Sequence, residues 1–142
     1  MSNHPIQMNW VNNTSYSMNF QVPRDPEDGT KPYAQPTTMQ PVGQPGNTSQ
    51  VSAEKRNALS RGPEGWYDWK VNGEFSGKTA FLNVSYDHPA DQSQTWVRVE
   101  CTEGTGFLVS SPESPTPERV KRFVDSTLQH GDASIRITIT RS

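Results

Sequence analysis

The sequence predicts an all-β protein, built as an antiparallel β-sandwich, with a closed barrel as the alternative. Three observations lead to this fold class. Apolar and polar residues alternate in about seven short segments, turn-forming residues recur about every 8 to 12 positions, and a single segment has the spacing of a helix. The 142 residues match the size of one domain, so we expect one continuous core.

The first two expected strands lie near the N-terminus. Ile6, Met8 and Trp10 alternate with polar residues, and the alternation resumes over 16–22 after an Asn-rich stretch at 12–15. Two strands joined by a tight turn fit this pattern best.

Residues 23–50 contain six prolines and several glycines, which deny the backbone regular ladder hydrogen bonds. We therefore expect a long Pro-rich loop over 23–50, and we favour a solvated insertion over an active lid. The following segment, 51–59, is compatible with either a strand or a loop.

Three strands are expected in the middle of the chain, over 66–71, 79–86 and 95–101. Their alternation places one set of side chains toward the core, including Tyr67, Leu82 and Val97. The same period of two places Trp66, Phe81 and Trp96 on the opposite, outer surface.

The C-terminal part adds a short apolar segment at 107–109, a helix and a final strand. The helix is predicted over 116–129, with Thr116 as N-cap, Pro117 at the first helical position and an apolar stripe. Isoleucines alternate with polar residues over 133–140, which indicates a half-buried strand.

The outward aromatic residues need an explanation because exposed aromatic rings lower solubility. Either the Pro-rich loop, the helix or a second subunit covers Trp66, Phe81 and Trp96, or they form a surface for a ligand or lipid. The sequence favours neither interpretation.

Composition and motifs argue against several other classes of protein. The formal net charge is −2 and the basic residues are scattered, so we do not expect a nucleic-acid binder. The only cysteine, Cys101, excludes an intrachain disulfide and lies on an inward strand face, where a thiol is packing material. Asp87, His88 and Asp91 resemble a turn more than a metal site. We expect no enzyme, no metal and no cofactor.

The N-terminus lacks the basic and apolar regions of a secretory signal peptide. No apolar run approaches the length that spans a bilayer as a helix. We therefore expect a protein that is made in soluble form.

Four segments of the chain are similar, in order and spacing, to the Gly-Thr-Glu-Gly and aromatic-Asp-x-Pro segments of aegerolysins. They are Arg61-Gly62-Pro63-Glu64-Gly65-Trp66-Tyr67, Val71-Asn72-Gly73-Glu74, Tyr86-Asp87-His88-Pro89 and Gln94-Thr95-Trp96. The chain resembles in particular the small aegerolysin-like components of bacterial two-component insecticidal toxins, from about Ile6 to Thr140. The loop over 23–50 and the helix over 116–129 are then insertions, and Arg61 stands near where lipid-binding fungal members carry an acidic residue.

This resemblance implies a non-enzymatic β-sandwich that binds membrane lipid and acts with a larger pore-forming protein. It also implies synthesis in the bacterial cytoplasm, later release and action at the target-cell membrane, with a homo-oligomer left open. The expected lipid-binding residues are Arg61, Glu64, Trp66, Phe81, Tyr86 and Trp96. The alternative function is a carbohydrate-binding module or lectin that stacks Trp66 and Trp96 on sugar rings.

Overall fold

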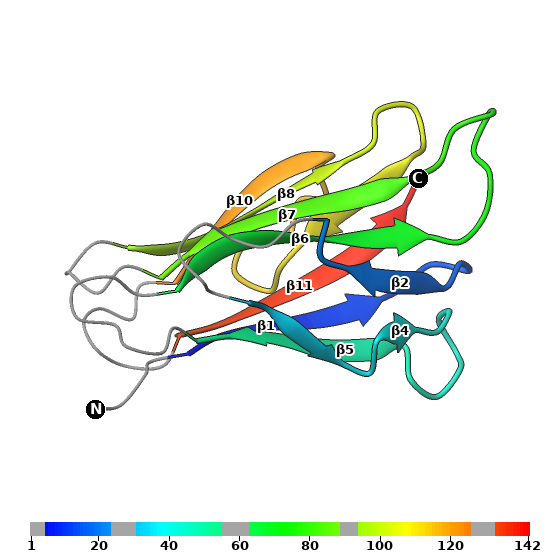
Figure 1. Cartoon of the computed structure of the whole chain (residues 1–142). Helices are drawn as coiled ribbons and strands as arrows, with labels where there is room; N and C mark the ends of the chain where they lie inside the picture. Colours follow the sequence, from blue (N-terminus) through cyan, green and yellow to red (C-terminus); the bar gives the residue numbers. More distant parts are fainter. Residues whose placement is uncertain (1–4, 24–30, 55–62, 89–93, 126–132) are drawn as a thin grey trace.

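The computed structural model describes residues 5–23, 31–54, 63–88, 94–125 and 133–142. These ranges contain eleven β-strands and no helix, and the strands form two sheets packed as a sandwich (Figure 1). The predicted all-β sandwich is therefore confirmed.

Sheet A has five strands in the order β3-β5-β1-β11-β9. The neighbours β1 and β11 run parallel, which departs from the antiparallel sandwich expected from the sequence, and the other neighbours in this sheet are antiparallel. The strands are β1 (Ile6–Asn12), β3 (Tyr33–Gln35), β5 (Thr48–Ala53), β9 (Phe107–Ser110) and β11 (Ala133–Arg141).

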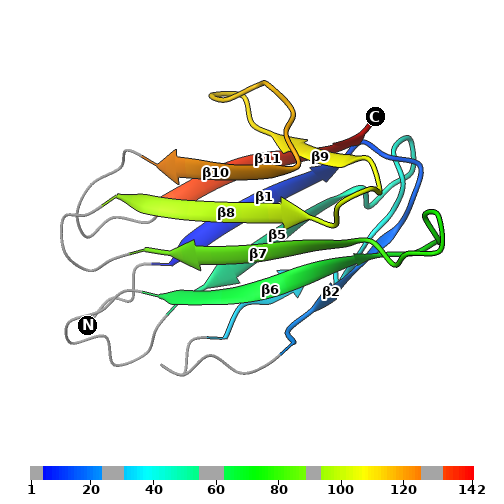
Figure 2. The same ribbon diagram turned by 90° about the horizontal axis from the view of Figure 1, so that it is seen from above.

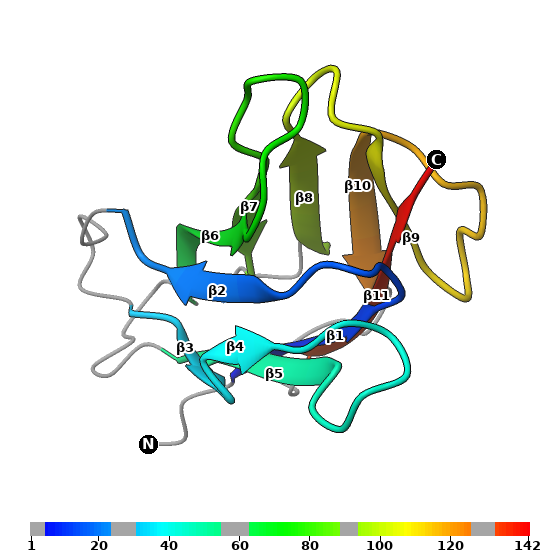
Figure 3. The ribbon, with the colours of Figure 1, turned by 90° about the vertical axis from the view of Figure 1, so that its right-hand side faces the viewer.

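Sheet B has six antiparallel strands in the order β10-β8-β7-β6-β2-β4, most of which lie side by side in Figure 2. The edge strands of the two sheets meet, so β9, β10 and β11 gather at one side of the sandwich and β3, β4 and β5 at the other (Figure 3). The strands of sheet B are β2 (Met18–Gln21), β4 (Thr38–Met39), β6 (Glu64–Val71), β7 (Phe81–Asp87), β8 (Thr95–Cys101) and β10 (Val120–Asp125).

The core lies between the sheets and is built from the alternating inward side chains that the sequence predicts. Trp10 of sheet A and Tyr67 of sheet B are at most 1% exposed, and Trp10 Nε1 donates a hydrogen bond of 2.8 Å to Tyr67 Oη. The Tyr67 hydroxyl in turn lies 3.2 Å from Met8 Sδ. The Trp10–Tyr67 hydrogen bond joins the two sheets, and it gives a partner to two buried polar atoms of aromatic side chains.

The expected N-terminal hairpin is wrong, because β1 and β2 belong to different sheets. The turn at 12–15 carries the chain across the sandwich, and the buried Asn12 side chain holds it. Asn12 Oδ1 accepts a 3.0 Å hydrogen bond from the Thr14 amide, and Asn12 Nδ2 donates to the carbonyl oxygens of Tyr16 and Gln40 at 2.7 and 3.1 Å. A tight Asn-rich turn can join two strands of one sheet or carry the chain from one sheet to the other, so the local sequence does not decide between a hairpin and a crossing.

The predicted long loop over 23–50 is wrong in its described part. Within it lie β3, β4 and the beginning of β5, while residues 24–30 are outside the described ranges. Because β3 and β4 are edge strands of only three and two residues, the prolines beside them interrupt no central ladder. The segment 51–59, left open between strand and loop, belongs to β5 as far as Ala53.

The predicted helix over 116–129 is also wrong in its described part. Residues 116–119 precede the strand β10, which pairs with β8, and residues 126–129 lie outside the described ranges. Lys121 and Phe123 are buried and the residues between and beside them point outward, which is the period of a strand. The apolar residues of this short run also fit a helical spacing, so pairing with β8 decides the outcome.

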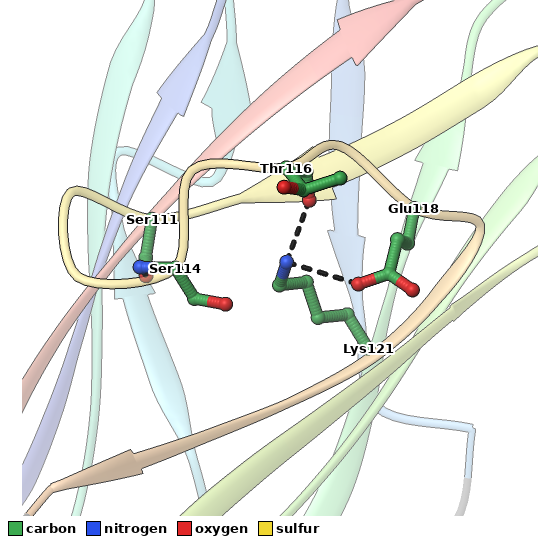
Figure 4. Close-up of polar contacts among 5 residues, drawn as sticks. All are labelled: Ser111, Ser114, Thr116, Glu118 and Lys121. Atoms are coloured by element: carbon green, nitrogen blue, oxygen red, sulfur yellow. Dashed lines mark hydrogen bonds and ion pairs between the residues drawn. The ribbon is translucent and has the colours of Figure 1, made fainter.

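Lys121 anchors the segment that leads from β9 into β10 (Figure 4). Lys121 is 7% exposed, and its Nζ donates to the Thr116 carbonyl oxygen at 2.6 Å and to Glu118 Oε2 at 3.0 Å. The Glu118 backbone also exchanges two hydrogen bonds with Val109 of β9. These contacts satisfy the buried ammonium group and fix the Pro-rich crossing between the sheets.

We expect Ile137→Ala to lower the free energy of unfolding by about 2 to 5 kcal/mol, because Ile137 is fully buried between the sheets. Arg136→Ala, one residue earlier on the outward side of β11, should change this free energy by less than about 0.5 kcal/mol. Chemical denaturation followed by tryptophan fluorescence measures both. Equal losses in the two variants would contradict the position of Ile137.

Candidate functional site

The outer face of sheet B carries the aromatic residues that the sequence places outside. Trp66 of β6, Phe81 of β7 and Trp96 of β8 are all half-buried and point away from the core. Their predicted orientation is therefore confirmed.

The strand register brings Trp66 and Trp96 near each other and leaves Phe81 apart. Trp66 lies opposite Ser85 of β7, and Trp96 lies opposite the adjacent outward residue of that strand, Asp87. Phe81 is four residues from Ser85 along β7, which places it about 13 Å farther along the sheet. The two tryptophans thus share one end of the face, with the small Ser85 side chain between their strands.

Strand β10 adds two residues to this end of the face. Val124 lies opposite Trp96 and is 52% exposed, and the Arg122 guanidinium carbon lies 5.0 Å from the centroid of the Trp96 ring. This distance is that of a cation–π contact. We call Trp66, Trp96, Arg122 and Val124 the Trp96 patch.

Arg122 and Val124 are not among the residues predicted from the sequence, because the pattern of this segment predicts a helix over 116–129. The signal that reveals them is the alternation of buried Lys121 and Phe123 with outward neighbours, a period of two. Read as a strand, this segment places an apolar and a cationic side chain on one outer surface.

The other predicted lipid-binding residues have different positions. Glu64 is half-buried at the rim of the Trp96 patch, in the same row as Asp87 and Trp96. Tyr86 points inward, is 1% exposed and packs 6.2 Å from the Tyr67 ring, so it does not reach the outer face. Arg61 lies outside the described residues.

Polar and charged side chains on neighbouring positions of β6, β7 and β8 are paired with one another. Arg98 forms an ion pair of 3.0 Å with Glu100, and Asn83 Nδ2 donates a 2.8 Å hydrogen bond to Asp68 Oδ1. Because these partners are solvent-exposed, they stabilise the fold little. The Arg122 guanidinium group, by contrast, lies against the Trp96 ring of the patch.

A cleft of about 290 Å³ adjoins the patch at the side of the sandwich where β10 and β11 meet. Arg122, Val124 and Asp125 line one wall, and Ser134 and Arg136 belong to the other. Asp125 Oδ2 accepts a 3.0 Å hydrogen bond from the Ser134 amide, which links β10 of sheet B to β11 of sheet A beside this cleft.

Cys101 lies in the core, on the inward face of β8, as predicted. Burial raises the pKa of its thiol to about 12. The nucleophilic thiolate is therefore scarce near neutral pH.

The expected turn at Asp87, His88 and Asp91 is described in part, since Asp91 lies outside the described ranges. His88 is buried and its Nδ1 contacts the Thr95 hydroxyl. Within the described part of the chain, no three His, Cys, Asp or Glu side chains gather as a metal site would require. In the same ranges, no helix has the length and apolar character needed to cross a membrane.

The raised pKa of Cys101 predicts a loss of stability at alkaline pH. An unfolded thiol ionises near pH 9, whereas the folded one stays neutral to about pH 12, so rising pH favours the unfolded chain between these values. From pH 7 to pH 10 the free energy of unfolding of wild type should fall by about 1.4 kcal/mol more than that of Cys101→Ala. Identical pH profiles would show that the thiol is not sequestered.

No protein-family model matches this chain, and no curated protein matches it either. The resemblance to aegerolysins therefore stays an expectation that rests on the segments between residues 61 and 96. The ligand of this chain is therefore inferred from the side chains that its outer faces present.

Proposed function

We propose that this protein is the non-catalytic membrane-binding component of a two-component pore-forming insecticidal toxin. It docks on lipid of the target-cell membrane through the Trp96 patch, and a larger partner forms the pore. The observation that carries this proposal is the contact of Arg122 with the Trp96 ring beside the exposed Val124. The aegerolysin-like segments supply the toxin context.

The chemistry of the Trp96 patch suits the surface of a bilayer. An indole ring is amphipathic and prefers the level of the lipid headgroups. A guanidinium group binds phosphate oxygens with paired hydrogen bonds, and an exposed valine beside it gains by leaving water for the acyl boundary. Trp96, Arg122 and Val124 offer these three properties at one end of sheet B.

The pairing of the strands within the sandwich supports a separate pore-forming partner. Each described strand pairs within one of the two sheets, and their inward side chains form one contiguous core. Inserting these strands into a membrane would expose that core and break the Trp10–Tyr67 bond. A larger companion protein avoids this cost.

The alternative function, a lectin that stacks sugars on Trp66 and Trp96, fits this face less well. Arg122 already lies over the Trp96 ring at 5.0 Å, so one face of this ring is occupied. A sugar stacking there would have to displace the guanidinium group, whereas a lipid phosphate would gain from its presence.

We expect Trp96→Ala and Val124→Asp to weaken binding to phosphatidylcholine–phosphatidylserine vesicles by about tenfold or more, since each removes an apolar contact from the patch. The matched control is Val42→Asp. Val42 is exposed to nearly the same degree as Val124, 49% against 52%, but lies in the turn between β4 and β5. Vesicle sedimentation measures all four proteins.

A loss of binding in Val42→Asp equal to that in Val124→Asp would point to a general effect of added negative charge and count against the patch. Thermal melting of each variant shows whether it is folded. Unchanged sedimentation of folded Trp96→Ala and Val124→Asp would contradict docking through this face.

Vesicles loaded with a fluorescent dye should stay sealed when the wild-type protein is added at concentrations at which it binds. A pore would require the paired strands to leave the sandwich, which the buried core opposes. Detergent provides the full-release control. Efficient leakage caused by this chain alone would contradict the two-component proposal.

A further inference from the structure

The outer face of sheet A, on the side of the molecule opposite the Trp96 patch, carries a row of polar side chains that crosses four strands. Gln35 of β3 lies opposite Gln50 of β5, Gln50 lies opposite Asn9 of β1, and Asn9 lies opposite Arg136 of β11. Because side chains opposite one another in neighbouring strands share a face, these four form one line. Three strand spacings give this line a length of about 14 Å.

A cleft of about 450 Å³ follows the same row. Its walls include the four residues of the row together with Val11, Thr48 and Pro36. Its volume is typical of sites that bind small molecules. Because the row along this cleft crosses four strands, the cleft suits an extended ligand.

The amide groups in the middle of the row are held in place by one another. Gln50 Nε2 donates to Gln7 Oε1 at 3.2 Å and to Asn9 Oδ1 at 3.1 Å, and Asn9 Nδ2 donates to Ser134 Oγ at 3.0 Å. This network fixes the orientation of the amides, so a ligand that binds them meets groups that are already ordered.

The two ends of the row have free binding capacity. Within the described part of the chain, the side chains of Gln35 and Arg136 make no hydrogen bond, and Arg136 makes no ion pair. Arg136 is also the only charged residue among the described strand residues that point outward from this face. An unpaired guanidinium at the end of a neutral polar row attracts one carboxylate.

An aromatic ring lies beside the other end. Tyr33 is two residues before Gln35 on β3, points to the same side and is 52% exposed. An exposed ring of this kind provides a flat apolar surface with a polar tip.

We propose that this row is a binding groove for an acidic oligosaccharide. The sugar carboxylate binds Arg136, its hydroxyl groups bind the amides of Asn9, Gln50 and Gln35, and a sugar ring stacks on Tyr33. A hydroxyl both donates and accepts, as does an amide side chain, which makes fixed amides suitable partners for a polyhydroxylated ligand. This groove is distinct from the Trp96 patch because its row lies on the outer face of sheet A, although Arg136 also lines the cleft that adjoins the patch.

Isothermal titration with trigalacturonate and with sialyllactose tests the proposal, using the methyl ester of the trimer and lactose as neutral counterparts. We expect wild type to bind at least one acidic sugar more tightly than its neutral counterpart. Arg136→Gln should weaken binding of the acidic sugar by about tenfold or more and leave the neutral sugar unchanged. Tyr33→Ala should weaken both forms.

The matched control is Arg98→Gln, which removes the same charge from the outer face of sheet B and should bind the acidic sugar as wild type does. Binding of neither acidic sugar, or equal losses in Arg98→Gln and Arg136→Gln, would overturn the proposal. Vesicle sedimentation of Arg136→Gln shows whether this substitution affects the lipid-binding site as well as the sugar-binding groove. Normal vesicle binding with lost sugar binding supports the groove, and normal sugar binding by Arg136→Gln overturns it whatever the vesicles show.

Discussion

The parallel pairing of β1 with β11 is the constraint on which the rest of the structure depends. It joins the first and last strands of the chain at the centre of sheet A. In this register Trp10 lies beside Ile137 on the core side, while Asn9 lies beside Arg136 on the outer side. A slip of β11 by one residue would exchange the two faces of that strand, turning Arg136 toward the core and Ile137 toward solvent.

The two outer faces differ in chemistry because the sheets draw on different strands. Sheet B places Trp66 and Trp96 beside Arg122 and Val124, a combination suited to a lipid headgroup and the acyl boundary beneath it. Sheet A presents ordered amides and Arg136, whose guanidinium group has no hydrogen-bond or ion-pair partner among the described residues, and these groups suit a polar ligand. The hydrogen bond from Trp10 to Tyr67 joins the two sheets, so their outer faces point in opposite directions.

Sequence patterns predict individual strands well and their partners poorly. Alternation alone gives the correct inward and outward sides of β6, β7 and β8, and hence the positions of Trp66 and Trp96. Alternation does not show which sheet a strand belongs to, so β1 and β2, which lie in different sheets, are predicted to form a hairpin. The segment of β10 is predicted to be a helix because its pairing with β8 is not visible in the sequence. The polar row is invisible in the sequence because its members come from residues 9, 35, 50 and 136 and meet only through register.

Recognition on the outer faces requires a sandwich that stays closed when the protein binds. Hydrogen exchange measured by mass spectrometry on free and vesicle-bound protein shows whether it stays closed. If the sandwich stays closed, amides of β1 and β11 exchange equally slowly in both states, and added protection is confined to the segments of β6, β8 and β10 that carry the Trp96 patch. Faster exchange of β1 and β11 on vesicles would contradict it, because the sandwich would then open at the membrane.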